Sequence, residues 1–389
     1  MKKNIVHIVD TLCVGGREKI VIDICNNLNK DHYNVHIITL TNDMNEIANL
    51  VNGKEVDLIA LPLKHGSLVG IKTLFNFFKA VLTLRNVIKS LNPEIIHTHS
   101  YLHRLLIVFT SIKSLSSKIT VFHTVHTSGM YYNPKSLVDK FKLQVERSII
   151  GILRPNLISI SEIIHQNNQR LFKEQSNLIK YIPNGIDLNF FNKQIYNIEP
   201  ERFGVIKSDI VLTYVARFCE GKNHITLLKA LNIIVAKYDN VKLILAGDGG
   251  TRNEIEDFIE EYSLGNKVIL LGAISNISEL LSITAIAVFP SEFEGFTLTL
   301  IEKMAMGLPV VAADNDIFKK LIKHRENGFL FSMFDSQALA ENVIELIEDE
   351  ILYKEVSKNS ILFSKQFSIE RMVFEHEDYY NLINAAVNN

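Results

Sequence analysis

Short apolar runs alternate with helix-like patterns along almost the whole chain. Each run is long enough for a buried strand, and the segments between several of them carry apolar residues at helical spacing. Such alternation is typical of parallel sheets covered by helices on both faces, and it argues against a sandwich or a helical bundle. Strands are predicted at residues 4–9, 35–40, 57–61, 94–98, 119–123, 157–160, 178–182, 210–216, 241–246, 268–271, 285–290 and 309–313.

Residues 285–313 show this pattern most fully, because they read as strand, loop, helix and strand. Leu298 and Ile301 begin the apolar face of the helix. In a parallel sheet, the loop at the carboxyl end of a strand lines the ligand crevice, and the free N–H groups that open the next helix bind anions. We therefore expect Glu294 and the amides that follow Gly295 to lie at such a crevice.

The length of the chain, 389 residues, exceeds one ordinary core and predicts two domains, or three at most. The near-neutral total charge hides an asymmetry between the two halves. Residues 1–183 carry 22 Lys and Arg against 13 Asp and Glu, a net charge of +9, whereas the remainder carries 19 against 30, a net charge of −11. Opposite charges of this size suggest two domains with different partners.

The three cysteines have neither paired nor metal-ligand spacing, which indicates a reducing compartment. The N-terminus reaches Asp10 after a short apolar run, so it predicts a first strand rather than a signal peptide. No uncharged run approaches the length needed to span a bilayer. These observations together predict a cytoplasmic protein.

Residues 71–91 predict a helix in which apolar residues, several of them aromatic, are interspersed with basic residues. Two interpretations stay open: ordinary core packing with solvated lysines, or a basic amphipathic helix that rests on an anionic membrane surface. The residues concerned are Leu74, Phe75, Phe77, Phe78, Val81 and Leu82 among Lys72, Lys79, Arg85 and Lys89.

Glycines and cations follow several predicted strands. Gly15 and Gly16 stand between the first strand and a helix, where they make either a plain turn or a close backbone approach to a ligand. Arg217 and Lys222 follow the strand at 210–216, where they are either ordinary surface charges or a pair of cations at the ligand crevice, a guanidinium fork and a lysine point charge. The glycine-rich turn at 247–250 predicts only a tight turn, since the sequence has neither GxGxxG nor the GK[ST] of a P-loop.

Two histidine pairs end predicted strands, His97 with His99 and His123 with His126. A zinc site would need a third or fourth ligand at suitable spacing, which the sequence does not show, and HExxH is absent. The segment Asp314-Asn-Asp316 spells the D-x-D of metal-dependent transferases, but it follows a strand and predicts a loop and helix cap. The sequence therefore predicts no metal site.

Several of these features occur together, in the same order, in a known family. The string PSEFEGFTLTLIEKMAMGLPVVA holds Glu294 and Glu302 with seven residues between them, and it resembles the E-x7-E motif of the retaining GT4 glycosyltransferases. VGGREK resembles the family's GG-x-E loop, Arg217 to Lys222 its R-x4-K diphosphate clamp, and IPNGID the segment that ends its first domain. The resemblance covers nearly the whole chain. One departure is DNDIFKK, where the family favours Gly-Gly-x-x-Glu.

The resemblance implies the GT-B fold, which has two Rossmann-like, doubly wound parallel-sheet domains facing across a cleft. The first domain would comprise residues 1–183, on the acceptor side, and the second residues 184–368, on the donor side. The last helix, residues 369–389, would cross back to the first domain.

The resemblance also implies the site. Glu294 would contact hydroxyls of the donor sugar, Glu302 the nucleotide ribose, and His126 the same sugar from the end of its strand. The implied catalytic residues are Glu294, His126, Arg217 and Lys222. The implied donor-binding residues are Gly15, Gly16, Arg217, Lys222, Gly295, Phe296, Thr297, Leu298 and Glu302.

The function expected from this resemblance is a retaining, metal-independent transfer of a sugar in surface polysaccharide synthesis. The donor would be a nucleotide diphosphate sugar, a UDP-sugar in our interpretation, and the acceptor a glycan or lipid-linked glycan. No cofactor and no nucleic acid partner is expected, and an anionic membrane surface is a further partner to test. Two alternatives are a nucleotide-sugar epimerase of the same fold and a catalytically silent binding subunit; the set of intact motif residues argues against the second.

Overall fold

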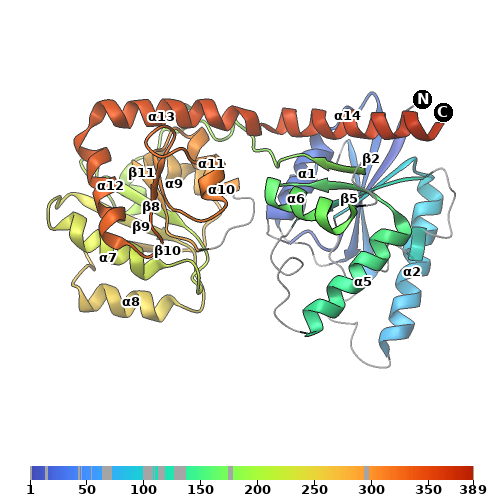
Figure 1. Ribbon diagram of the computed structural model, residues 1–389, viewed down its shortest axis with the longest axis horizontal. Coiled ribbons are helices and arrows are strands. Elements are labelled where there is room, and N and C mark those ends of the chain that lie inside the picture. The colour runs from blue at the N-terminus through green and yellow to red at the C-terminus, as the bar shows by residue number, and fades with distance from the viewer. Residues whose placement is uncertain are drawn as a thin grey trace. The chain divides into compact units, whose positions relative to one another are not determined.

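The computed structural model describes residues 2–13, 16–42, 44, 46–53, 55–63, 72–99, 108, 110–112, 119–126, 137–173, 178–292 and 298–388. The chain forms two compact units. Unit 1 comprises Met1–Gly185 together with Ile369–Asn389, and unit 2 comprises Ile186–Ser368. The chain thus leaves unit 1 after Gly185 and re-enters it at Ile369 (Figure 1).

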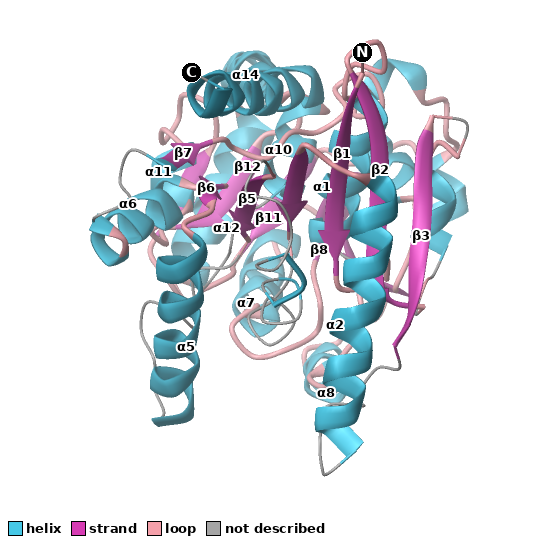
Figure 2. Cartoon of the chain, turned by 90° about the vertical axis from the view of Figure 1, so that its right-hand side faces the viewer, coloured by secondary structure: helices cyan, strands magenta, loops and turns pink. Residues whose placement is uncertain are grey.

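Seven described strands form the sheet of unit 1 in the order β3-β2-β1-β4-β5-β6-β7, and every neighbouring pair is parallel. Figure 2 shows β1, β2 and β3 side by side. Their apolar side chains are almost wholly buried, as expected for parallel strands covered on both faces. The strands are β1 (Lys3–Val9), β2 (Tyr33–Thr41), β3 (Val56–Leu63), β4 (Ile95–Thr98), β5 (Thr120–Val125), β6 (Asn156–Ser159) and β7 (Ile179–Tyr181).

Helices cover this sheet, and the last helix of the chain is one of them. That helix, α14 (Ile369–Asn388), packs against α1 (Gly16–Asn27) (Figure 1). Its Tyr380 is fully buried, and Asn384 accepts a hydrogen bond of 2.8 Å from the hydroxyl of Thr120 on β5. The other described helices of this unit include η1 (Glu46–Leu50), α2 (Lys72–Leu91), α5 (Leu137–Leu153) and α6 (Glu162–Leu171).

Unit 2 repeats the plan. Its described strands form a parallel sheet in the order β10-β9-β8-β11-β12-β13. These strands are β8 (Ile210–Val215), β9 (Val241–Ala246), β10 (Val268–Gly272), β11 (Ile286–Phe289), β12 (Val310–Ala313) and β13 (Phe329–Phe331). The helices include α7 (His224–Val235), α8 (Arg252–Glu261), α9 (Ile277–Ile283), α10 (Leu298–Ala305), α11 (Phe318–Leu321), α12 (Ser336–Glu348) and α13 (Glu350–Ser364), with short turns η3 (Lys193–Ile195), η4 (Pro200–Phe203) and η5 (Lys365–Phe367).

Both sheets confirm the predicted fold class, two Rossmann-like parallel α/β domains. Strand order reverses beside the first strand of each sheet, between β1 and β4 in unit 1 and between β8 and β11 in unit 2. In this architecture, the ligand crevice lies outside the carboxyl ends of the strands at such a reversal. The segments that follow these four strands are therefore where a ligand site is expected.

The helix α2 buries apolar side chains on one face and exposes others on another. Ala80, Leu84 and Ile88 are buried against the sheet. Phe78 and Leu82 point outward and are 54% and 56% exposed. The side chain of Phe75 lies outside the described residues. Within the described part of the chain, no helix is both long and apolar enough to cross a membrane.

Candidate functional site

The loop after β8 carries Arg217 and Lys222, and hydrogen bonds tie it to the loop after β11. The Tyr214 hydroxyl donates to the backbone oxygen of Lys222 at 3.0 Å and lies 2.7 Å from the Ser291 hydroxyl. The backbone N–H of Glu292 donates to the Gly221 oxygen at 2.8 Å. The predicted cations thus stand where the strand order of unit 2 reverses.

A glycine-rich turn supports this loop from the other side. A Cβ on Gly247 would lie 1.8 Å from the Ala216 oxygen, and one on Gly249 would lie 2.2 Å from the Phe218 oxygen. Both glycines have positive φ, 149° and 153°, which L side chains rarely adopt. The turn at 247–250 was expected to be merely tight. Its close packing also fixes the backbone on each side of Arg217, a role that the sequence did not reveal.

Arg217 is exposed and Lys222 is half-buried. Within the described ranges, no carboxylate forms an ion pair with the Arg217 guanidinium. A fixed backbone beneath an outward-facing guanidinium, with a lysine five residues later, presents positive charge to a ligand. The arrangement suits an anion such as a diphosphate.

The helix α10 comprises Leu298–Ala305 and buries Ile301 and Met304, two residues of the predicted apolar face. Glu302 is half-buried on its second turn. Lys303 is wholly buried, which the apolar spacing did not predict; its Nζ donates to the Thr299 oxygen at 3.3 Å and lies 4.8 Å from the centre of the Phe289 ring. The predicted site residues Glu294, Gly295, Phe296 and Thr297 lie outside the described residues.

The Asp314-Asn-Asp316 segment serves the loop after β12, as predicted. Asp314 accepts the Met333 N–H at 3.2 Å and pairs with Lys319 at 3.2 Å. Asn315 accepts the N–H groups of Ile317 and Phe318 at the start of α11. These side chains are therefore engaged in holding the loop and the helix start.

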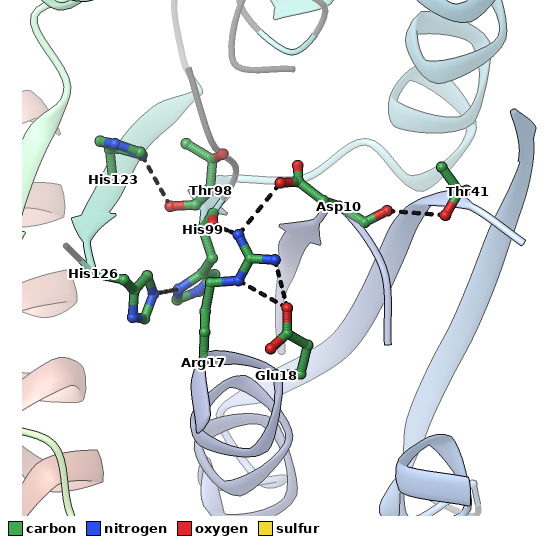
Figure 3. Close-up of polar contacts among 8 residues, drawn as sticks. All are labelled: Asp10, Arg17, Glu18, Thr41, Thr98, His99, His123 and His126. Atoms are coloured by element: carbon green, nitrogen blue, oxygen red, sulfur yellow. Dashed lines mark hydrogen bonds and ion pairs between the residues drawn. The ribbon is translucent and has the colours of Figure 1, made fainter. Parts of the chain in front are cut away.

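In unit 1, the end of β1 and the start of α1 form a charged cluster (Figure 3). Arg17 donates to Asp10 and to the backbone oxygen of His99, both at 3.3 Å, and its Nε donates to Glu18 at 2.9 Å. Arg17 thereby connects the β1 and β4 ends at the strand reversal of unit 1, a connection that the sequence did not suggest. Gly16 is exposed at the first position of α1, whereas Gly15 lies outside the described residues.

Next to this cluster lies a group of histidines, of which His7 and His99 are buried and His126 is partly exposed. His7 Nδ1 lies 3.2 Å from His99 Nε2, and His99 Nδ1 lies 3.1 Å from His126 Nε2, a contact drawn in Figure 3. Burial lowers the pKa of His7 to about 3, and burial followed by neighbouring positive charge lowers the pKa values of His99 and His126 well below the usual range. All three rings are neutral at pH 7.

The sequence spacing shows no third ligand for the histidine pairs, but the structure brings His7 next to His97 and His99. Strands β1 and β4 are neighbours with His7 opposite His97, and one ring nitrogen each of His7, His97 and His99 lies within 4.8 Å of the others. The signal was present in the sequence, because His7 lies in the first strand and a reversal of strand order brings that strand beside β4. His97, however, already has both ring nitrogens bonded, to Tyr380 at 2.6 Å and to Thr124 at 2.7 Å.

Comparison with known proteins gives two family matches. Residues 14–190 match the family profile described as "Glycosyltransferase Family 4", and residues 197–363 match the one described as "Glycosyl transferases group 1". Together these matches cover most of both units.

Individual relatives are distant but span most of the chain. An N-acetyl-alpha-D-glucosaminyl L-malate synthase from Bacillus anthracis is 24% identical over 74% of each chain. A UDP-Gal:alpha-D-GlcNAc-diphosphoundecaprenol alpha-1,3-galactosyltransferase from Escherichia coli is 24% identical over 81% of this chain and 82% of its own. Among solved structures, HepE from Anabaena in complex with UDP and glucose aligns with a TM-score of 0.77 at 20% identity, covering 97% of this chain and 99% of its own.

Proposed function

Since the chain belongs to glycosyltransferase family 4, a family of GT-B fold, we propose that it transfers a sugar from a UDP-sugar to a hydroxyl of a glycan or lipid-linked glycan. Transfer proceeds with retention of configuration at the sugar carbon and serves surface polysaccharide synthesis. Support comes from HepE, which was crystallised with UDP and glucose, and from the Escherichia coli relative, whose name specifies UDP-Gal and a diphosphoundecaprenol-linked acceptor.

The observation that carries the proposal is the position of Arg217 and Lys222. They lie on a loop braced by Gly247, Gly249 and Tyr214, at the strand reversal where this architecture binds ligands. When the bond between sugar and diphosphate breaks, the leaving diphosphate gains negative charge. Cations fixed in advance stabilise that charge without having to reorganise.

The other site residues take complementary roles in the proposal. Glu302 holds the ribose, and Glu294 and His126 contact the donor sugar. The amide of Gly16 and the N-terminal amides of α10 add positive potential for the diphosphate. The two cations replace the divalent metal that many transferases use, so the reaction needs no cofactor.

A thermal-shift comparison of nucleotides tests donor binding. A ligand that binds only the folded state at 100 times its Kd stabilises it by about 2.7 kcal/mol. For a unit of this size, that corresponds to a rise in melting temperature of roughly 5–10 °C. We expect UDP and UDP-sugars to produce the shift and CMP to produce none.

Two outcomes would contradict the proposal. One is a chain whose melting temperature responds to no nucleoside diphosphate. The other is a UDP response that survives the double change Arg217→Ala and Lys222→Ala, because UDP would then bind elsewhere. A chain that binds UDP-sugar and interconverts two sugars without any acceptor would be an epimerase, and chromatography of the products distinguishes this case.

A further inference from the structure

Three imidazole rings in unit 1 are joined end to end by hydrogen bonds. His7 lies on β1, His99 directly after β4, and His126 directly after β5. The nitrogen separations are 3.2 Å between His7 Nδ1 and His99 Nε2, and 3.1 Å between His99 Nδ1 and His126 Nε2. We call this set the histidine chain. Its inner end, His7, is fully buried, and its outer end, His126, is partly exposed.

The chemistry of neutral imidazole imposes a restriction on the histidine chain. Each neutral ring has one N–H donor and one acceptor nitrogen. His99 uses both of its nitrogens, one toward each neighbour. If its Nδ1 carries the proton, His126 Nε2 must accept and His7 Nδ1 must donate, so all three rings are protonated on Nδ1. If its Nε2 carries the proton, all three are protonated on Nε2. The three tautomers are therefore coupled.

A metal ion is a poorer explanation of the same contacts. A metal shared by His7, His97 and His99 would need a lone pair from His97, and both nitrogens of that ring are bonded to hydroxyls. It would also have to replace the direct contact between His7 and His99. The observed distances are those of nitrogen–nitrogen hydrogen bonds.

We propose that His7 and His99 are positioning residues that fix the tautomer and ring orientation of His126. The nitrogen that His126 does not use toward His99, Nδ1, then meets its ligand as one defined group, either a fixed donor or a fixed acceptor. The inference rests on the proposed function in one respect, that His126 contacts the donor sugar. The coupling of the tautomers does not depend on that contact.

Nitrogen-15 NMR of the histidine-labelled full chain tests the coupling directly, because ring nitrogen shifts report which nitrogen carries the proton. Signals are assigned by the variants His126→Gln, His99→Phe and His7→Leu. We expect His7, His99 and His126 to share one tautomer at neutral pH. We expect His126 to become a mixture of tautomers in His99→Phe and in His7→Leu, so that either variant suffices if the other does not fold.

The matched control is His123→Asn. His123 is buried in the same region and donates to the Thr98 oxygen at 3.1 Å, a bond that asparagine can keep, and it stands outside the histidine chain. We expect this variant to leave the His126 tautomer unchanged. We expect turnover to fall roughly tenfold or more in His99→Phe, the scale for losing a partner that orients a functional histidine, and to stay near wild type in His123→Asn.

Different tautomers within the histidine chain of the wild type would overturn the inference. An unchanged His126 tautomer in His99→Phe, or one equivalent of zinc in the purified protein, would do the same. If the protein transfers no sugar while the shared tautomer is observed, the proposed function fails and the coupling stands. The two claims therefore fail separately.

Discussion

Lys222 and Glu302 have different roles in the proposed donor site: Lys222 stabilises charge in the transition state, and Glu302 binds the donor. Lys222 faces the group whose charge grows in the transition state, so Lys222→Ala should lower turnover roughly hundredfold. Glu302 holds a ribose that does not change during the reaction, so Glu302→Ala should raise the KM for the donor while turnover changes little. Steady-state kinetics with a defined acceptor separates the two effects.

The control for this pair is Lys229→Ala, since Lys229 is an exposed lysine of α7 on the helix that follows the cation loop. It should behave as wild type. If Lys222→Ala kept full turnover, Lys222 would have no role at the diphosphate. Arg217→Lys would then show whether the diphosphate needs the guanidinium fork or only a positive charge at this position.

A second prediction at the residue scale is that sugar transfer does not require a metal ion. The carboxylate of Asp314 is engaged with Met333 and Lys319, and the nitrogens of His97 with two hydroxyls. Sugar transfer should therefore continue unchanged after dialysis against EDTA. The measurement is the initial rate with and without chelator, followed by readdition of Mg²⁺, Mn²⁺ or Zn²⁺. Loss of activity with EDTA and recovery with one of these ions would show a metal in the reaction.

Sequence reasoning proposes the candidate residues that local motifs mark, and it missed the contacts that only packing defines. Arg217, Lys222 and Glu302 stand at strand ends or helix positions that the pattern of apolar residues fixes. His7 lies in the predicted first strand, but no motif links it to His97, because that relation depends on which strands are neighbours. The role of Gly247 was hidden for the same reason, because Ala216, against which it packs, is 31 residues away in the chain.

At the scale of elements, buried strands were the most predictable parts. Strand β9 has the predicted bounds, and β8 differs by one residue, because continuous apolar runs have few alternatives. The helices α5 and α6 were not predicted. Part of α5 faces solvent with apolar residues, including Phe141 at 69% exposure and Ile152 at 62%.

The helix α2 carries the element-scale prediction. Phe78, Leu82, Arg85 and Lys89 recur at helical spacing on one face, which combines an exposed aromatic ring and an exposed leucine side chain with positive charge. Figures 1 and 2 show α2 and α5 extending from the sheet of unit 1 in the same direction. We predict that this face binds an anionic, cytoplasmic membrane surface, where each nearby basic residue contributes on the order of 1 kcal/mol.

Co-sedimentation with liposomes measures this binding. Recovery should require anionic lipid and should fall steeply with added salt, since the screening length near physiological salt is about 8 Å. The double change Phe78→Ser and Leu82→Ser should weaken binding, as should neutralising Lys79, Arg85 and Lys89. The matched control is Ile351→Ser, because Ile351 is 80% exposed in unit 2. Equal recovery with neutral and anionic vesicles would leave α2 as an ordinary surface helix.

At the scale of the whole molecule, the two units differ in how many neutral histidines they bury. Burial lowers the pKa of each histidine, to about 4 for His123, His376 and His224, and to about 3 for His7. Unit 2 has His224 alone among its described residues with such a shift. The strongly lowered histidines of unit 1 are His7, His97, His99, His123, His126 and His376.

This difference predicts that acid unfolds unit 1 before unit 2. Between the folded pKa and the unfolded value near 6.5, the unfolded chain binds more protons than the folded one, so stability is complete above about pH 6.5 and falls as the pH decreases. At about pH 5.5 each such histidine lowers the free energy of unfolding by about 1.4 kcal/mol, and several together approach the whole stability of a domain, 5–15 kcal/mol.

Hydrogen exchange followed by mass spectrometry measures the protection of each unit through the peptides that belong to it. After correction for the intrinsic effect of pH on exchange, unit 1 peptides should lose protection first, and His123→Asn should reduce that loss because one titrating group is gone. Equal loss in both units would mean that carboxylates, which both units carry, govern acid stability instead.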